Sequence, residues 1–382
     1  MLPLALYIHW PFCKSKCPYC DFNSHVRENI DHGGWKQAYL DEMRFYREKT
    51  GAREIKSIFF GGGTPSLMEP DTVAAVIDEA HKLWGLPQGA EVTLEANPTS
   101  VEAEKLRGFK TAGVNRVSLG VQSLQAEDLK KLGRQHSPDE AIAALKIASS
   151  IFDRYSFDLI YARPQQSLAD WQAELEEAIA FGAGHMSLYQ LTIEQGTPYY
   201  TLHQRGELVI PEESLAADMY EYTQERMEKH GMPAYEISNH ARFGDESRHN
   251  LVYWTYGDYA GIGPGAHGRL TLEGEKWATR AHRAPEIWRQ RVAAAGHGAH
   301  PFENIDVSRR GWEALMMGLR LADGLSLEIL EGEAQAPLSR IVNESRLKIL
   351  VGEKLVEVTP TRIRATDTGR QKLNSVLSYL AA

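Results

Sequence analysis

The chain has 382 residues, of which 43% are hydrophobic and 24% are charged. This composition argues against disorder and allows one large barrel with a smaller domain. The formal net charge of −9 argues against nucleic-acid binding, because a binder normally gathers excess Lys and Arg to neutralise phosphates. No apolar run approaches the ~20 residues that a membrane-spanning helix needs, so any membrane contact would be peripheral.

The first ten residues contain an apolar run, but no basic segment precedes it and no small-residue cleavage site follows it. We therefore interpret this stretch as a strand rather than a targeting signal. The chain has only three cysteines, an odd number that suits a reducing compartment better than a disulfide framework. We expect a cytoplasmic protein.

Between residue 4 and about residue 227, short apolar runs alternate with segments of helical period, the pattern of repeated βα units in the α/β fold class. Each strand is short and largely apolar, as buried parallel strands are, and Ser100 and Ser137 stand where helix N-caps are expected. Six units in residues 1–232 fall short of the eight that close a full barrel. The predicted strands are 4–9, 57–60, 91–95, 116–121, 156–161 and 186–191, and the predicted helices are 35–49, 70–84, 101–112, 137–150, 167–181 and 212–230.

Two further regions are predicted. Residues 233–300 form a connecting region rich in Gly and aromatic residues, whose central part is neither a simple helix nor a simple strand. Residues 301–382 form a mainly α domain, in which a hairpin of strands 355–359 and 362–365 resembles that of a winged-helix module. Because the chain is acidic, we expect a packing or partner domain rather than a DNA-binding one. The predicted helices of this domain are 309–321, 326–331, 338–351 and one from residue 367.

All three cysteines, Cys13, Cys17 and Cys20, stand in one short segment with the spacing Cys-x3-Cys-x2-Cys. Three thiolates placed in this way can hold three irons of a 4Fe-4S cluster and leave the fourth iron open to a substrate or cofactor. Zinc is the alternative, with His9 or His25 as the fourth ligand, although structural zinc ligands usually come as separated pairs.

This spacing after an apolar strand, with the aromatic residue Tyr19 before Cys20, resembles the signature of the radical S-adenosylmethionine superfamily. The resemblance implies an open, partial (β/α)6 barrel with its site at the carboxyl ends of the strands. It also implies that the open iron chelates S-adenosylmethionine, and that an electron from the cluster cleaves this cofactor to a 5'-deoxyadenosyl radical. An electron donor is then required.

The segment Gly61-Gly62-Gly63-Thr64-Pro65 follows the predicted strand that ends at Phe60. Taken alone it is a plain turn, but beside the cysteines it resembles the superfamily's glycine-rich motif, which meets the amino group of S-adenosylmethionine. Polar residues at other strand ends have a structural alternative, as caps or buried ion pairs. The positions that match the superfamily's S-adenosylmethionine contacts are Tyr7, Tyr19, Gly62, Gly63, Thr64, Glu95, Gln122, Arg134 and Asp158.

Over nearly the whole chain, the sequence resembles oxygen-independent coproporphyrinogen III dehydrogenase and the related HemW family of haem chaperones. Two departures favour HemW. Phe22 stands where the dehydrogenase has another cysteine, and His249-Asn-Leu-Val-Tyr-Trp254 resembles the HemW motif His-Asn-x-x-Tyr-Trp. This resemblance implies a protein that binds haem and passes it to an acceptor protein. The alternative is the dehydrogenase, which releases carbon dioxide from two propionate side chains.

His249 is the candidate haem ligand, because neutral imidazole can take an axial position on haem iron. His267 is a second candidate, and a buried, hydrogen-bonded packing role is the alternative for either histidine. The chain contains no Cys-x-x-Cys-His segment, so covalent c-type attachment is disfavoured. The aromatic residues that could cover an apolar macrocycle are Tyr253, Trp254, Tyr256 and Tyr259.

Overall fold

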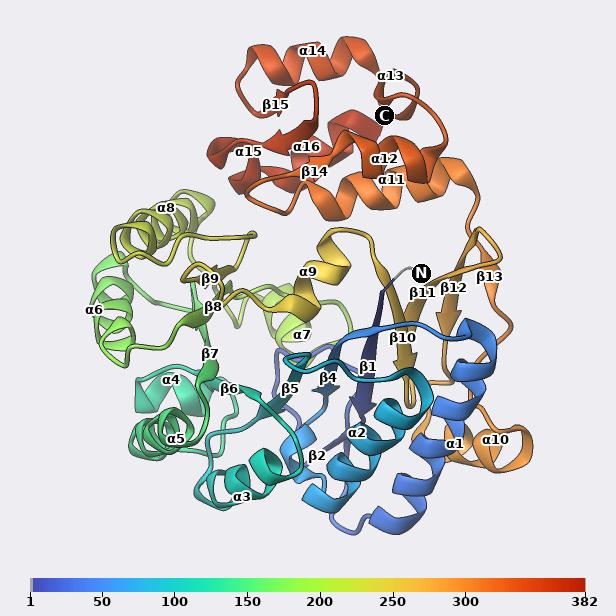
Figure 1. Ribbon diagram of the computed structural model, residues 1–382. Helices are drawn as coiled ribbons and strands as arrows, with labels where there is room; N and C mark the ends of the chain where they lie inside the picture. Colours follow the sequence, from blue (N-terminus) through green and yellow to red (C-terminus); the bar gives the residue numbers. More distant parts are fainter. Residues whose placement is uncertain (1–2, 382) are drawn as a thin grey trace.

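The computed structural model describes residues 3–381 and is built on an 11-stranded sheet with the order β13-β12-β11-β10-β1-β4-β5-β6-β7-β8-β9 (Figure 1). The strands β1 and β4 to β8 lie side by side in parallel, so the fold is a partial (β/α)6 barrel. All six predicted strands are confirmed to within two residues. They are β1 (Leu4–Trp10), β4 (Ile55–Gly62), β5 (Glu91–Ala96), β6 (Arg116–Gln122), β7 (Arg154–Tyr161) and β8 (His185–Gln190).

Six long helices cover the outer face of these strands (Figure 1). Ser137 caps its helix together with Glu140, as the sequence predicts. Ser100 instead is the first helical residue, and the cap is Thr99, whose side chain accepts a hydrogen bond from the Glu102 N–H. The helices are α1 (His32–Thr50), α2 (Pro70–Trp84), α3 (Ser100–Thr111), α5 (Pro138–Ile151), α6 (Leu168–Ile179) and α8 (Glu213–Lys229).

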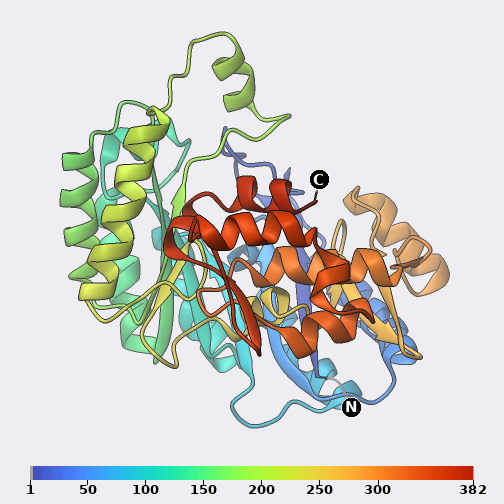
Figure 2. The same cartoon turned by 90° about the horizontal axis from the view of Figure 1, so that it is seen from above.

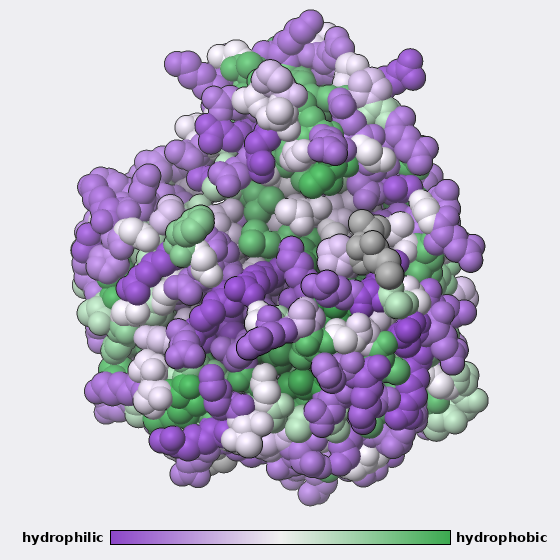
Figure 3. Space-filling view, viewed as in Figure 1, coloured by the Kyte–Doolittle hydropathy of each residue, from purple (hydrophilic) through white to green (hydrophobic). Residues whose placement is uncertain are grey.

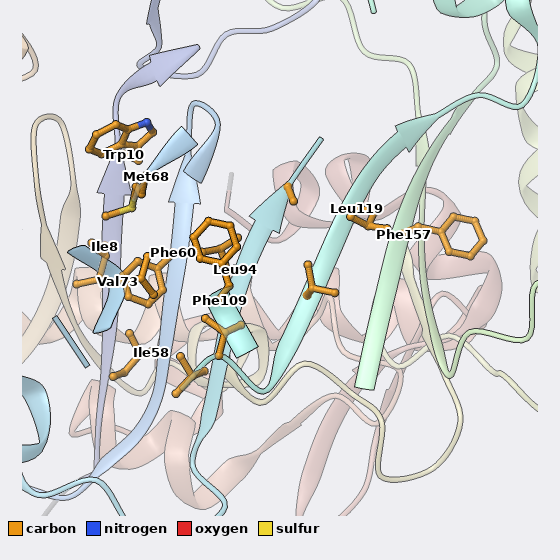
Figure 4. Close-up of a cluster of buried hydrophobic side chains, with 14 of the residues drawn as sticks. Ile8, Trp10, Ile58, Phe60, Met68, Val73, Leu94, Phe109, Leu119 and Phe157 are labelled. Atoms are coloured by element: carbon orange, nitrogen blue, oxygen red, sulfur yellow. The ribbon is translucent and has the colours of Figure 1, made fainter. Parts of the chain in front are cut away.

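The main hydrophobic core lies between the sheet and these helices (Figure 4). Ile58 and Phe60 on β4 are fully buried with Val73 of α2 and Phe109 of α3. Burial of each such side chain stabilises the fold by roughly 1.5–3 kcal/mol. This core fixes the strands, and therefore the residues at their carboxyl ends.

The Gly- and aromatic-rich region holds elements that the sequence pattern did not separate. Its strands extend the sheet at both edges: β9 pairs with β8, and β10 pairs in parallel with β1. A Cβ on Gly261 would lie 2.0 Å from the His267 carbonyl oxygen, so glycine is needed for close strand packing here. The elements are β9 (Asn239–Ala241), α9 (Arg248–Trp254), β10 (Asp258–Ile262), β11 (His267–Leu272), β12 (Glu275–Arg280), α10 (Pro285–Ala295) and β13 (Glu303–Asn304).

Residues 307–381 form a second cluster of elements, here called the C-terminal module, with a hydrophobic core of its own. The predicted hairpin is confirmed as β15 (Val356–Val358) and β16 (Arg362–Ala365), and β14 (Leu325–Ser326) adds a third strand. The prediction of one helix over 338–351 is wrong, because Val342 is extended and the Asn343 side chain caps a new helix. The helices are α11 (Val307–Gly318), α12 (Leu327–Ala334), α13 (Leu338–Ile341), α14 (Glu344–Gly352), α15 (Asp367–Gln371) and α16 (Leu373–Ala381).

The C-terminal module contacts the barrel near both ends of the open sheet (Figure 2). On the β10–β12 side, Glu313 accepts hydrogen bonds from Tyr256 at 2.8 Å and Arg269 at 3.0 Å. On the other side, Arg320 pairs with Glu236 at 3.3 Å, beside β9. Hydrophobic residues are visible where the module meets the barrel, and further hydrophobic patches lie lower on the same face (Figure 3). The module therefore bridges the open side of the barrel.

Four short elements lie at or near the cysteine segment. The strands β2 (Phe12–Cys13) and β3 (His25–Val26) pair in parallel. The helices α4 (Ala126–Lys131) and α7 (Pro198–Gln204) were not predicted from the sequence; the Tyr199 hydroxyl of α7 donates to the Lys131 carbonyl of α4, and the Tyr199 N–H donates to the Pro18 carbonyl of the cysteine segment. Among the helices of residues 3–381, none combines the length and hydrophobicity of a membrane span.

Candidate functional site

The three cysteines lie in a loop that leaves the carboxyl end of β1. Cys13 ends β2, and the Cys20 N–H donates to the Cys17 carbonyl at 3.2 Å, which closes a turn between these two residues. The Tyr199 N–H of α7 donates to the Pro18 carbonyl at 3.0 Å. In residues 3–381, no three His, Cys, Asp or Glu side chains converge on a position for one metal ion.

One cavity of about 1100 Å³ opens beside this loop, and all three cysteines line it. The structure also brings eight of the nine residues predicted to contact S-adenosylmethionine to its wall. Single ligands usually occupy pockets of roughly 300–1,000 Å³, so this cavity has room for more than one small molecule. The eight residues are Tyr19, Gly62, Gly63, Thr64, Glu95, Gln122, Arg134 and Asp158.

Arg134 and Thr64 tie the cysteine loop to the barrel. The Arg134 guanidinium lies 3.6 Å from the Cys17 Sγ and donates to the Asn97 side chain at 2.6 Å. The Thr64 hydroxyl lies 3.4 Å from the Cys13 Sγ. A cation beside sulfur stabilises the thiolate form that binds metals. Asn97 was missed in the sequence, although it follows a predicted strand closely, as the predicted site residue Glu95 does.

The glycine-rich turn is required by its packing against β1. Gly62 has φ +116°, and a Cβ there would lie 2.6 Å from the His9 ring. A Cβ on Gly63 would lie 2.7 Å from the Phe12 carbonyl oxygen. Packing within the protein therefore requires glycine at both positions, whether or not a ligand binds. Their contact with S-adenosylmethionine stays a prediction.

Two half-buried carboxyl groups, Glu95 on β5 and Asp158 on β7, line the cavity. Burial, and then the charge of Asp158, raise the pKa of Glu95 to about 8. Burial raises the pKa of Asp158 to about 6, against hydrogen bonds from Ser187 and Ser118 that lower it. Glu95 is therefore largely protonated at neutral pH, and a protonated carboxyl group can both donate and accept hydrogen bonds.

Gln122 stands at the end of β6 with φ 69°, in the left-handed region. Such a backbone costs roughly 1–3 kcal/mol for a non-Gly residue and is concentrated at functional sites. The register of β6 against β7 shifts between Leu119 and Gln122. This irregularity accompanies the placement of Gln122 on the wall of the cavity.

Tyr7 and His249 lie outside the lining of the cavity. The Tyr7 hydroxyl lies 3.0 Å from His9 Nδ1. His249 is 1% exposed, with Nδ1 2.9 Å from Ser57 Oγ and Nε2 2.6 Å from the Tyr253 hydroxyl. Burial lowers the pKa of His249 to about 3, so the ring is neutral. With both ring nitrogens bonded, this histidine binds haem only after one bond opens.

His267, the second predicted haem candidate, begins β11 and is exposed. It also lies outside the cavity lining. Burial of part of the ring, with Arg269 and Arg280 nearby, lowers its pKa. The structure therefore does not bring the two candidate histidines together with the cysteines around one cavity.

Comparisons with known proteins match the whole chain. The Radical SAM superfamily model matches residues 7–178, and the HemN C-terminal domain model matches residues 308–371. Heme chaperone HemW of Escherichia coli is 36% identical over 100% of this chain and 98% of its own length. Radical S-adenosyl methionine domain-containing protein 1, mitochondrial, of Bos taurus is 41% identical over 98% of this chain and 87% of its own.

A solved structure has the same fold. Coproporphyrinogen III oxidase (HemN) from Escherichia coli, described as a radical SAM enzyme, superposes with a TM-score of 0.82 over 99% of this chain and 90% of that chain. Its sequence identity is 20%, so this likeness shows the architecture and carries no conclusion about activity.

Proposed function

This chain belongs to the radical S-adenosylmethionine superfamily and, within it, to the HemW family, and from that membership we propose that it is a haem chaperone, which binds haem and passes it to an acceptor protein. The observation that carries the proposal is the match over the full length to proteins named heme chaperone HemW, at 36% and 32% identity. The superfamily implies a 4Fe-4S cluster and S-adenosylmethionine.

The cysteine loop fits such a cluster. Its three thiol groups are the only ones in the chain, and they line one cavity without converging on a single ion. Cys13, Cys17 and Cys20 would each hold one iron. The cluster would supply the electron for reductive cleavage of S-adenosylmethionine. Arg134, next to Cys17, balances part of the negative charge that three thiolates bring.

The walls next to the loop fit S-adenosylmethionine, which carries a sulfonium cation, an amino acid group and ribose hydroxyls. Glu95 on β5 and Asp158 on β7 offer oxygens, and Gln122, on the strand β6 between them, and Arg134 offer N–H donors. We assign the cofactor to this part of the cavity. Tyr7 is not part of the cavity lining and bonds to His9 at 3.0 Å, so its contact with the cofactor stays a prediction.

We infer that the same cavity takes haem. Its wall as a whole carries several aromatic rings, and one of them, Phe22, 57% exposed, stands in the cysteine loop, where the dehydrogenase that this chain resembles has a cysteine. Flat apolar macrocycles pack well on such rings. His249 as axial ligand stays a prediction, and it requires release from Tyr253 or Ser57. The aromatic lining residues are Tyr19, Phe22, Tyr161, Tyr189 and Tyr220.

The second candidate function is coproporphyrinogen III dehydrogenation, favoured by the shared architecture with HemN. One experiment separates the two. The protein is reconstituted anaerobically, incubated with S-adenosylmethionine, a reductant and coproporphyrinogen III, and assayed for carbon dioxide release, while haem binding is measured on the same preparation. The chaperone proposal expects haem binding without decarboxylation. Decarboxylation without haem binding would establish the enzyme instead.

A further inference from the structure

The cavity continues from the cysteine loop to the C-terminal module, and this far half has a different charge. The part of the wall formed after residue 200 carries three cationic residues, Arg320, Arg370 and Lys372, and one anionic residue, Glu213. The chain as a whole is acidic, with a net charge of −9. Two of these cations have an anionic partner outside the lining, Glu236 for Arg320 and Asp367 for Arg370, so the capacity for an anionic ligand depends on the guanidinium donors that these pairs leave unused.

Arg370, on α15, is buried to 9% exposure and lines the cavity. Its Nη2 pairs with Asp367 at 2.8 Å, but the Asp367 side chain is 96% exposed, so water screens this pair. The buried Nε has no hydrogen-bond partner among residues 3–381. A buried guanidinium N–H without a partner is unfavourable, and a small rotation of the side chain would turn this N–H toward the cavity that Arg370 lines, where a ligand oxygen would satisfy it.

Arg320 offers a second guanidinium from the turn after α11. Its Nη2 pairs with the buried Glu236 at 3.3 Å, and its buried Nε also has no partner among the described residues. The guanidinium lies 4.5 Å over the ring of Trp254, the last residue of the His-Asn-x-x-Tyr-Trp motif. Trp254 therefore acts as a positioning residue that holds Arg320 in place by a cation–π contact.

These two sites suit carboxylates. A guanidinium binds a carboxylate through parallel N–H bonds, and its Nε–H is one of the donors in that geometry. The lining of the cavity also includes the apolar and aromatic side chains Tyr220, Ile237 and Leu373, among polar ones. A ligand that fits both features has a broad apolar body with carboxylates at its edge.

We propose that Arg320 and Arg370 bind the propionate carboxylates of a tetrapyrrole, whose macrocycle lies along the aromatic wall toward the cysteine loop. This inference rests on the proposed haem function and adds the residues that orient the ligand. It assigns the C-terminal module a direct part in the binding site. It also gives the tryptophan of the motif a role distinct from that of His249.

The test compares haem with its dimethyl ester, in which both propionates are uncharged, on the full-length reconstituted protein. Arg320→Gln and Arg370→Gln should each raise the dissociation constant for haem about tenfold and leave that for the ester unchanged. Wild type should bind the ester at least about tenfold more weakly than haem. Arg370→Lys, which keeps the charge, should lie between wild type and Arg370→Gln.

The matched control is Arg364→Gln, which removes a cation from the same module at a surface ion pair with Glu357, outside this cavity. It should bind haem as wild type does. If wild type binds haem but Arg320→Gln and Arg370→Gln, folded by circular dichroism, bind it equally well, the inference is overturned and the proposed function stands. If wild type binds no haem, both the inference and the proposed function are wrong.

Discussion

Glu95 lines the cavity in a position where its ionised form is unfavourable. Its carboxyl group is surrounded by the barrel interior, and its nearest donor is the Gly62 N–H, 3.3 Å from Oε2. Asp158 adds a second negative charge when ionised. Like charges and burial together oppose ionisation. Both groups are therefore poised for a ligand that supplies hydrogen-bond donors or positive charge, as S-adenosylmethionine does.

The ligand-free protein should gain stability from Glu95→Gln, and more so at higher pH. The folded pKa of about 8 lies above the ordinary 4.5, so the unfolded chain loses its proton first and the free energy of unfolding falls between these pH values. The advantage of the variant over wild type should grow from pH 5 to pH 8, to at most about 5 kcal/mol. Chemical denaturation measures it, with the exposed Glu48→Gln as control. An advantage that does not change with pH would contradict this account.

Cys17→Ala should abolish cluster assembly and leave the barrel folded, because the core is hydrophobic rather than metal-built. Iron and sulfide analysis after anaerobic reconstitution measures the loss, and circular dichroism checks the fold. Ser15→Ala, in the same loop and the same cavity wall, is the control and should keep its iron. A Cys17→Ala protein with a full four-iron complement would remove this residue from the ligand set.

Gly62→Ala should destabilise the protein more than Gly85→Ala. Both glycines have positive φ, but a Cβ on Gly85 would meet nothing within 4 Å, whereas one on Gly62 would meet His9 and Trp10. Overpacking adds about 1–3 kcal/mol to the loss of unfolding free energy. Equal losses of unfolding free energy in the two variants would show that β1 shifts to make room for the added methyl group at no cost. For this reason, weaker cofactor binding in a Gly62 variant would not by itself show a ligand contact.

At the scale of elements, sequence reasoning succeeded where burial alone decides the structure. The strands β1 and β4 to β8 were found because buried parallel strands are short and largely apolar. The strand β10 was missed, because Gly261 and Gly263, which serve close packing against β11 and β1, look like turn residues in the sequence. The cysteine and glycine motifs predicted the part of the cavity that lies beside the cysteine loop. Arg320 and Arg370 could not be found, since only tertiary packing brings them to it.

The helix α9 is the element whose role is most open to experiment. His249 and Tyr253 stand one turn apart and bond to each other. Tyr253→Phe would remove this bond and keep the packing, so if His249 ligates haem, the variant should bind haem a few times more tightly, as expected for a net hydrogen-bond energy of about 1 kcal/mol. Haem titration measures the change. Weaker or unchanged binding would indicate that His249 is not released on loading.

The other residue of this hydrogen bond is changed in His249→Ala, which should lower the free energy of unfolding by about 2–4 kcal/mol. The variant leaves a buried cavity and removes the hydrogen-bond partner of the Ser57 and Tyr253 hydroxyls. If His249 is the axial ligand, the Soret band should also shift. A double variant with His267→Ala tests substitution by the second histidine. A wild-type Soret spectrum in both variants would place the ligand elsewhere.

At the scale of the whole molecule, the C-terminal module closes the open side of the barrel and contributes the cationic end of the cavity. It is held at the β10–β12 side by Glu313 with Tyr256 and Arg269, and at the other side by Arg320 with Glu236. In the arrangement that we propose, the barrel would hold the cluster and S-adenosylmethionine. The module would bind the carboxylate groups of the ligand.

We propose that this cavity binds haem beside a 4Fe-4S cluster without converting a porphyrinogen. A haem titration of the anaerobically reconstituted wild-type protein, followed at the Soret band, tests this, with iron and sulfide measured on the same sample. We expect saturable binding of one haem per chain while the four-iron complement is retained. The absence of saturable haem binding in a protein with an intact cluster would contradict it.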